Sequence, residues 1–181
     1  MNIGVVLLGC GRIISVCGLS VIYYICCAET KMQIFMVETK VYTSFLKPDN
    51  YQRESIVDFL HTHLEEYGDE RQDIDKAVAY ALKERASLGG FIIKAKKADE
   101  IVGVVVVNRT GMEGYIPENI LVYIASHKRC RGQGVGKQLM QEAIELSQGD
   151  IALHVEPDNP AKFLYEKLGF ENKYFEMRFK K

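Results

Sequence analysis

A glycine-rich turn between a strand and a helix constrains the fold of this chain more than any other feature of its sequence. Residues 119–125 contain the apolar run Ile-Leu-Val-Tyr-Ile and are predicted to form a strand, and residues 135–147 carry apolar side chains at helical spacing. Between them, residues 131–136 read Arg-Gly-Gln-Gly-Val-Gly. Glycines allow successive backbone N–H groups to converge, and the dipole of the following helix adds positive potential. The turn therefore predicts an anion site that suits a pyrophosphate.

Basic side chains around the turn, those of Arg129, Arg131 and Lys137, support an anionic ligand. The pattern differs from a Walker A loop, because Lys137 is followed by Gln138 and the glycine spacing is different. It also differs from the dinucleotide-binding pattern, since its glycines fall at i, i+2 and i+4. A strand-to-helix turn with a purely structural role remains the alternative.

The periodic segments elsewhere in the chain predict an α/β (α+β) fold, with a mixed central sheet and helices on both faces. Strands are expected over residues 37–45, 91–96, 101–108, 119–125, 151–155 and 174–179, and helices over 51–66, 73–86, 135–147 and 160–168. The polar turn 97–100 joins two of these strands into an antiparallel hairpin. A strand–helix–strand crossover follows later in the chain, and it makes the direction of the sheet mixed.

Length and composition narrow the class of protein. The chain has 181 residues, enough for one domain with a sizeable core, and its formal net charge of -1 gives no basic face for nucleic acid. The four histidines show no spacing typical of metal ligands, so no metal is expected. Beyond residue 27 the only cysteine is Cys130, which favours a reducing compartment and hence a cytoplasmic location.

The N-terminal segment has a different composition from the rest. Residues 3–27 are almost wholly apolar and contain one charged residue, Arg12. Three interpretations stay open: an extension outside the functional domain with a natural start at Met32 or Met36, a membrane anchor, or a signal peptide. If it is an anchor, Lys31 and Lys40 favour a cytoplasmic body. We expect residues 1–31 to be an extension and residues 32–181 to form the domain.

A second motif follows the predicted strand 151–155, and it consists of Asn159, Ala161, Tyr165 and the pair Gly169-Phe170. Together with the turn, this motif resembles the GNAT superfamily of N-acetyltransferases. The cofactor loop of that family follows the pattern Gln or Arg-x-x-Gly-x-Gly or Ala, which Arg131, Gly134 and Gly136 meet. The two motifs span about residues 119–170, and the order of the upstream elements also agrees.

The resemblance implies acetyl-CoA as co-substrate. In this family a bulge separates two parallel strands, and pantetheine lies between them. The implied cofactor-binding residues are Val122, Ile124 and Ser126 through their backbone, Arg131, Gly132, Gln133, Gly134, Val135, Gly136 and Lys137 around the pyrophosphate, and Asn159 beside the pantetheine arm. For Asn159 the alternative is a helix N-cap, because it directly precedes Pro160.

The resemblance also implies direct transfer of the acetyl group to a primary amine. Tyr165 would supply the proton or hydrogen bond that the leaving thiolate needs, and its alternative is an aromatic core residue. Glu118 is the first candidate for the base that deprotonates the amine, with Glu156, Glu113, Tyr123 and water as rivals. Cys130 is expected to have no catalytic role.

The acceptor is expected to be a small-molecule or peptide amine. The acidic run at residues 65–70 lies where this family usually forms its acceptor site, so it would attract a cation, although a charge run at a helix end is more often only solvated. The alternative function is a non-catalytic acyl-CoA-binding regulatory module. A homodimer is a further expectation, since dimers are common in the family, and a membrane contact is expected only if residues 3–27 are a true anchor.

Overall fold

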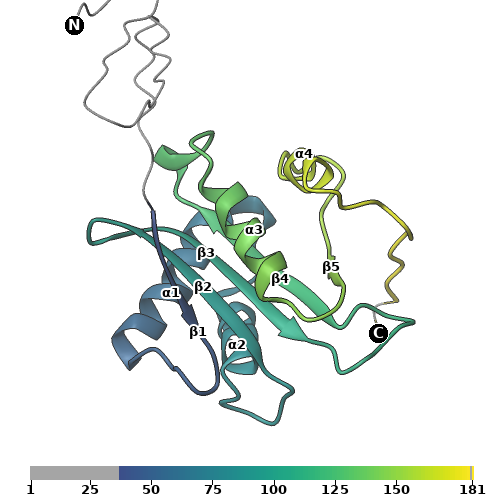
Figure 1. Cartoon of the computed structure of the whole chain (residues 1–181), viewed down its shortest axis with the longest axis horizontal. Coiled ribbons are helices and arrows are strands. Elements are labelled where there is room, and N and C mark those ends of the chain that lie inside the picture. Colours follow the sequence, from purple (N-terminus) through teal and green to yellow (C-terminus); the bar gives the residue numbers. More distant parts are fainter. Residues whose placement is uncertain (1–36, 180) are drawn as a thin grey trace, which may run out of the picture. The chain divides into compact units, whose positions relative to one another are not determined.

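The computed structural model describes residues 37–179 and 181. Its centre is a five-stranded sheet in the order β1-β2-β3-β4-β5 (Figure 1). The strands are β1 (Glu38–Tyr42), β2 (Gly90–Lys97), β3 (Glu100–Arg109), β4 (Asn119–Ser126) and β5 (Ile151–Leu153). The first four strands pair antiparallel with their neighbours, and β5 pairs parallel to β4. The predicted mixed sheet is therefore confirmed.

Helices cover both faces of this sheet. They are α1 (Asn50–His63), α2 (Arg71–Ala81), α3 (Val135–Leu146) and α4 (Lys162–Lys167), with the short 3-10 turns η1 (Glu65–Tyr67) and η2 (Lys128–Cys130). The α1 helix begins after Asp49, whose carboxylate accepts the N–H of Gln52 at 2.7 Å as an N-cap. In Figure 1, α3 lies on one side of the sheet and α1 and α2 lie on the other.

Two apolar clusters fill the spaces between the sheet and the helices. Alternation along β3 sends Val104 and Val106 into the cluster under α1 and α2, and Val105 and Val107 into the cluster under α3 and α4. Because both faces of β3 are buried, its sequence is a continuous apolar run rather than an alternating one. Gly103 allows α3 to pack close to the sheet, since a Cβ there would lie 2.6 Å from Leu139 Cδ1.

Some element bounds differ from the sequence prediction. The predicted strand 174–179 is wrong as the structure stands, because these residues form no ladder with any neighbouring strand. The predicted strand 37–45 shortens to β1, which ends where the Thr43 hydroxyl accepts the N–H groups of Phe45 and Leu46. These hydrogen bonds turn the chain away from β2.

The predictions for residues 1–31 lie outside the described residues. Within residues 37–179, the structure has no helix of the length and hydrophobicity that a membrane crossing requires.

Candidate functional site

The strands β4 and β5 pair over a short stretch and then separate. Their parallel pairing covers Asn119 to Leu121 of β4, but β4 continues to Ser126 while β5 ends at Leu153. A bulge lies at the point of separation, because Leu121 and Tyr123 pair with adjacent residues of β3 and Val122 pairs with none. The apolar packing agrees, since Val122 and Tyr123 both lie against the cluster under α1 and α2. The sheet therefore opens beside the second half of β4.

Two hydrogen bonds show which backbone groups of β4 face this opening. The N–H of Asn119 points toward β5, where it donates to Asp150 O at 3.1 Å. The N–H of His127 points toward β3, where it donates to Val102 O at 2.9 Å. Because neighbouring residues of a strand alternate in direction, the backbone groups of Ile124 and Ser126 face the opening. These are two of the three β4 residues that the sequence predicted to bind pantetheine.

The glycine-rich turn follows β4 and leads into α3. Gly132 and Gly134 have φ angles of 74° and 89°, in the left-handed region that favours glycine. A Cβ built on either residue would meet no heavy atom within 4 Å, so the turn presents bare backbone at an open surface. Among the described residues, no acceptor is bonded to the N–H groups of Gly132, Gly134, Val135, Gly136 and Lys137.

Two N–H groups of the predicted set are already used inside the turn. Arg131 donates to Lys128 O and Gln133 donates to Cys130 O, both at 3.2 Å. The remaining free donors are those of the glycines and of the first turn of α3. They coincide with the positive end of the helix dipole, which is the arrangement that binds phosphate in many folds.

The basic side chains of the turn are held by an acidic residue from the distant α1–α2 connection. Glu65 accepts from Arg131 at 2.8 Å and lies 3.1 Å from Lys128 Nζ. The hydrogen bond with Lys128, followed by the charge of Arg131, lowers the pKa of the Glu65 carboxyl. Glu65 also has a φ angle of 56°, which is uncommon for a residue with a side chain. Sequence reasoning had marked only an acidic run here.

Two histidines lie against this ion-pair group. The rings of His63, at the end of α1, and His127, after β4, have centroids 4.6 Å apart. Burial, and then the positive potential near His127, lower the pKa of His63. The end of α1 is thus packed against His127, which lies between β4 and the glycine-rich turn.

The α4 helix lies on the other side of the opening and carries Tyr165. The Tyr165 ring is 8% exposed and packs in the cluster under α3 and α4, with its centroid 6.1 Å from that of Phe170. Burial raises the pKa of its phenol to about 12. Its hydroxyl has no hydrogen-bond partner among the described residues. A buried ring with an unpartnered hydroxyl is compatible with both predicted roles, the packing role and the donor role.

Asn159 caps the turn that leads into α4. Its Oδ1 accepts the N–H of Ala161 at 2.9 Å and so holds this turn, whereas the N-cap position of α4 itself is Ala161, which has no side-chain cap. The Nδ2 of Asn159 donates to no described residue. One residue can therefore hold the turn with its oxygen and leave its N–H₂ for another acceptor.

Glu118 lies at the opposite end of β4 from the opening. Its carboxylate accepts the N–H of Asp150 at 2.7 Å and the N–H of Gly114 at 3.2 Å. Backbone hydrogen bonds, with its own N–H first and then those of Asp150 and Gly114, lower its pKa. It precedes Val122 by four residues, roughly 13 Å along an extended strand. These contacts give Glu118 a structural task away from the opening, and its predicted role as the base stays a prediction.

Tyr123 and Asp69 form a pair beside the bulge. The Tyr123 hydroxyl donates to Asp69 Oδ2 at 2.6 Å, and the tyrosine is only 7% exposed. Burial first, and then Asp69, raise the pKa of Tyr123, so it stays a phenol at neutral pH. Asp69 itself is exposed. Sequence reasoning included Asp69 in the acidic run but did not single it out.

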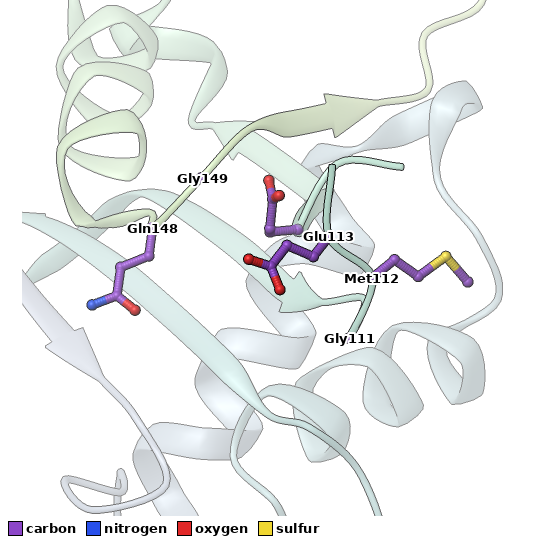
Figure 2. Close-up of a pocket in the computed structure, with 6 residues that line it drawn as sticks. Gly111, Met112, Glu113, Gln148 and Gly149 are labelled. Carbon is purple, nitrogen blue, oxygen red and sulfur yellow. The ribbon is translucent and has the colours of Figure 1, made fainter. Parts of the chain in front are cut away.

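The other rivals for the base occupy different places. Glu156 follows β5. The pKa of Tyr67 is raised, first by burial and then by the negative charges of Asp158, Glu66 and Glu156. Glu113 lines a surface pocket of about 430 Å³ together with Met112, Glu118 and the 148–149 turn, and Figure 2 shows this pocket. That pocket lies at the start of β4, away from the opening. Over residues 37–179, no group of three or more acidic, histidine or cysteine residues is arranged to hold a metal.

Comparison with known protein families gives one match. The sequence model of the acetyltransferase (GNAT) family matches residues 47–170, which is more than half of the chain. No curated protein sequence matches the chain.

Several solved structures share the fold over most of their length. A protein from Pyrococcus horikoshii OT3 is 26% identical and covers 77% of this chain and 93% of its own, with a TM-score of 0.58. A transcriptional regulator from Bacillus halodurans C-125 is 23% identical and covers 79% of this chain and 99% of its own, with a TM-score of 0.58. An aminoglycoside N-acetyltransferase in complex with CoA is 15% identical and covers 81% of this chain and 95% of its own, with a TM-score of 0.60.

Proposed function

Because the chain belongs to the GNAT family of acetyltransferases, we propose that it transfers an acetyl group from acetyl-CoA to a primary amine by direct attack, with both substrates bound together. Acyl transfer is the chemistry of the family, and the amine acceptor and the direct mechanism are our proposal. The observation that carries it is the separation of β4 from β5 next to a turn with free N–H groups.

The residues around the opening fit acetyl-CoA. We assign the pyrophosphate to the free N–H groups of the turn and of the first turn of α3, where backbone donors and the helix dipole act together. We assign the pantetheine amides to the backbone of Val122, Ile124 and Ser126 and to the Asn159 side chain. Lys137 lies in the first turn of α3 and can add charge, whereas Arg131 is paired with Glu65.

Acetyl-CoA supplies the acyl group as an activated thioester, and the protein has to deal with two protons. The amine must lose a proton before its nitrogen can form the new bond to the carbonyl carbon, because an alkylammonium has a pKa of about 10. The sulfur that leaves when the C–S bond breaks needs a proton or a hydrogen bond.

Tyr165 is our choice for the group that stabilises the leaving sulfur. Its pKa of about 12 keeps the phenol protonated at any physiological pH, so it is always a donor. A thiol of the cysteine kind has a pKa of about 8.5, so complete transfer of the phenol proton to the thiolate would be unfavourable. We therefore assign Tyr165 a hydrogen bond to the sulfur rather than full proton transfer, and the proton that the thiol finally carries comes from solvent.

Asp69 is our choice for the group that accepts the amine proton. Asp69 is exposed and lies beside the bulge. Tyr123 donates a hydrogen bond to one of its carboxylate oxygens, and the other oxygen is left for the amine substrate. Tyr123 then acts as a positioning residue, which fixes the carboxylate through a hydrogen bond. This assignment replaces Glu118.

A panel of amines tests the proposal, with release of free CoA thiol as the readout. The panel contains a peptide N-terminus, a lysine, a polyamine and an amino sugar, and a no-amine control measures hydrolysis. Thiol release that depends on one amine class, with the acetylated amine found by mass spectrometry, supports the proposal. Binding of acetyl-CoA without turnover of any amine would favour the alternative, an acyl-CoA-binding regulatory module. We also propose a cytoplasmic location, from the lone Cys130 in the body.

A further inference from the structure

The first strand, β1, leaves one border of the sheet open. It pairs with β2, and in the part of the chain that the structure describes no strand lies on its other side (Figure 1). Its outer backbone groups are therefore unpaired, as at any sheet edge. The chain is nevertheless held just before β1, because Gln138 Nε2 from α3 donates to Val37 O at 3.2 Å. An edge that is fixed in this way is a template for one more strand.

Two lysines at this edge lack an acidic partner. Lys40 of β1 stands directly opposite Lys94 of β2, and their ammonium groups lie 5.1 Å and 5.0 Å from the centre of the Tyr42 ring. Neither lysine forms an ion pair with a described residue. Lys94 is only 3% exposed, and burial, followed by the charge of Lys96, lowers its pKa. Like charges directly opposite each other destabilise a sheet, so a carboxylate beside Lys40 would stabilise this edge.

The carboxylate that β1 itself carries, that of Glu38, lies too far along the strand to serve Lys40 of the same copy. The two residues are both exposed and share the face of Tyr42, but positions two apart on a strand are roughly 7 Å from each other. Glu38 also forms no ion pair with a described residue. The opposite face of the strand carries Val37 and Val41, which are partly buried against the cluster under α3 and α4. One face of the edge is therefore charged and the other is apolar.

This pattern of charged and apolar residues is complementary to itself. If a second copy of β1 runs antiparallel with the two Thr39 residues opposite each other, Glu38 of each copy stands opposite Lys40 of the other. In the same register, Val37 of each copy stands opposite Val41 of the other. Moving the centre of the pairing to residue 38 or to residue 40 would instead place two glutamates or two lysines opposite each other. A centre between two residues would set the charged face of one copy beside the apolar face of the other.

We propose that β1 is an interface for a second copy of this chain, in which the two β1 strands pair antiparallel about Thr39 and join two sheets into one. Each Lys40 then has a carboxylate on its outer side, which offsets its repulsion from Lys94 on the inner side. A lysine on an edge strand usually discourages pairing, so the edge accepts only a strand that presents an acid opposite Lys40. The twofold symmetry closes the assembly at two copies. The inference does not depend on acetyl transfer.

Sedimentation velocity of the full chain over a series of concentrations tests this pairing. We expect the unchanged chain to pass from monomer to dimer as its concentration rises. Lys40→Glu should weaken the dimer at least about tenfold, because each opposed pair of unlike charges becomes a pair of glutamates. Glu38→Lys should have the same effect through opposed lysines. Lys167→Glu, at an exposed position of α4, makes the same change of net charge as Lys40→Glu and should leave the dimer intact.

Mixing the two variants of β1 tests the register itself. The Glu38→Lys copy presents two lysines and the Lys40→Glu copy presents two glutamates, so pairing about Thr39 brings unlike charges together at both positions. An equimolar mixture should therefore dimerise, although each variant alone remains a monomer at the same concentration. Both substituted side chains are exposed, and circular dichroism checks that the variants are folded.

Three results would overturn the proposal. One is an unchanged chain that stays monomeric over the whole concentration series. Another is a dimer that neither variant of β1 weakens, because the interface would then lie elsewhere on the molecule. The third is a mixture of the two variants that stays monomeric, because the two charged positions would then not face each other as the register requires. All three readouts are independent of acetyl transfer, so a wrong acceptor or mechanism would leave this test unaffected.

Discussion

Replacing Tyr165 by Phe removes one hydroxyl and keeps the ring, so it separates the donor role from the packing role. The ring is 8% exposed and lies in the cluster under α3 and α4, and Phe fills the same space. Because the hydroxyl has no partner among the described residues, its loss leaves no other described group unsatisfied. We therefore expect a change in unfolding free energy below about 1 kcal/mol.

The effect on turnover follows from the pKa of the phenol. At about 12, the phenol is a hydrogen-bond donor to the leaving sulfur rather than a strong acid. A hydrogen bond to a charged group contributes about 1.5–3 kcal/mol, and each 1.36 kcal/mol is tenfold in rate. The expected fall in kcat is therefore about 13- to 160-fold. Affinity for acetyl-CoA should change little, because the thiolate charge exists only in the transition state.

The assay is steady-state thiol release with the preferred amine, with acetyl-CoA affinity measured separately by calorimetry. Tyr115→Phe is the control, because Tyr115 is 79% exposed in a loop at the start of β4 and the same hydroxyl is removed. Single-turnover measurements must show that chemistry limits the rate. A Tyr165→Phe variant with near-normal kcat under those conditions would refute the reasoning and leave Tyr165 as a core residue.

Further predictions concern the turn, the two acids and the N-terminal segment. Acetyl-CoA should raise the Tm, because a hundredfold excess over Kd adds about 2.7 kcal/mol to the free energy of unfolding. Gly134→Val should abolish this shift. Gly114→Val, with a comparable φ of 77°, is the strain control and should retain it. Glu118→Gln should lower the Tm at pH 7 but not well below pH 4.5, because a carboxyl whose pKa is lowered by folding stabilises the fold only at pH values where it is ionised. A Tm at pH 7 equal to that of the unchanged chain would contradict this. Asp69→Asn should lower kcat/KM at least about tenfold, and an unchanged pH–rate profile would exclude it as the base. A chain starting at Met32 should fold and keep kcat/KM, and failure to fold would show that residues 1–31 belong to the domain.

The sequence predicts the strand, turn and helix to which we assign the cofactor, because these elements are local. The residues from Val122 to Lys137 follow one another as strand, turn and helix, and each step has its own signal. Apolar run, alternate glycines and helical spacing are properties of neighbouring residues, so no long-range contact is needed to read them. The structure adds which N–H groups of the turn are free, since this depends on the hydrogen bonds of Arg131 and Gln133.

The acceptor side is not predictable in the same way. Asp69 and Tyr123 are 54 residues apart, and Glu65 and Arg131 are 66 apart, and nothing in the local pattern pairs them. Glu118 illustrates the reverse case, because the sequence gives no sign that the loop conformation will supply backbone donors to a carboxylate at the start of a strand. The spacing of surface acidic residues in the sequence does not distinguish a solvated carboxylate from one that pairs with a residue far along the chain.

The bulge in β4 connects these two sides, and its sequence signal is absent for a physical reason. A bulge interrupts the alternation of side chains between the two faces of a strand. In a strand that alternates apolar and polar residues, it would appear as two successive apolar or two successive polar residues. The residues around Val122 are Ile-Leu-Val-Tyr-Ile, all apolar, because this part of β4 has a covered face on each side. The break in alternation at Val122 therefore leaves the composition unchanged. The same burial that makes β4 easy to predict as a strand hides the one irregularity that opens the sheet, and only the pairing of Leu121 and Tyr123 with adjacent residues of β3 reveals it.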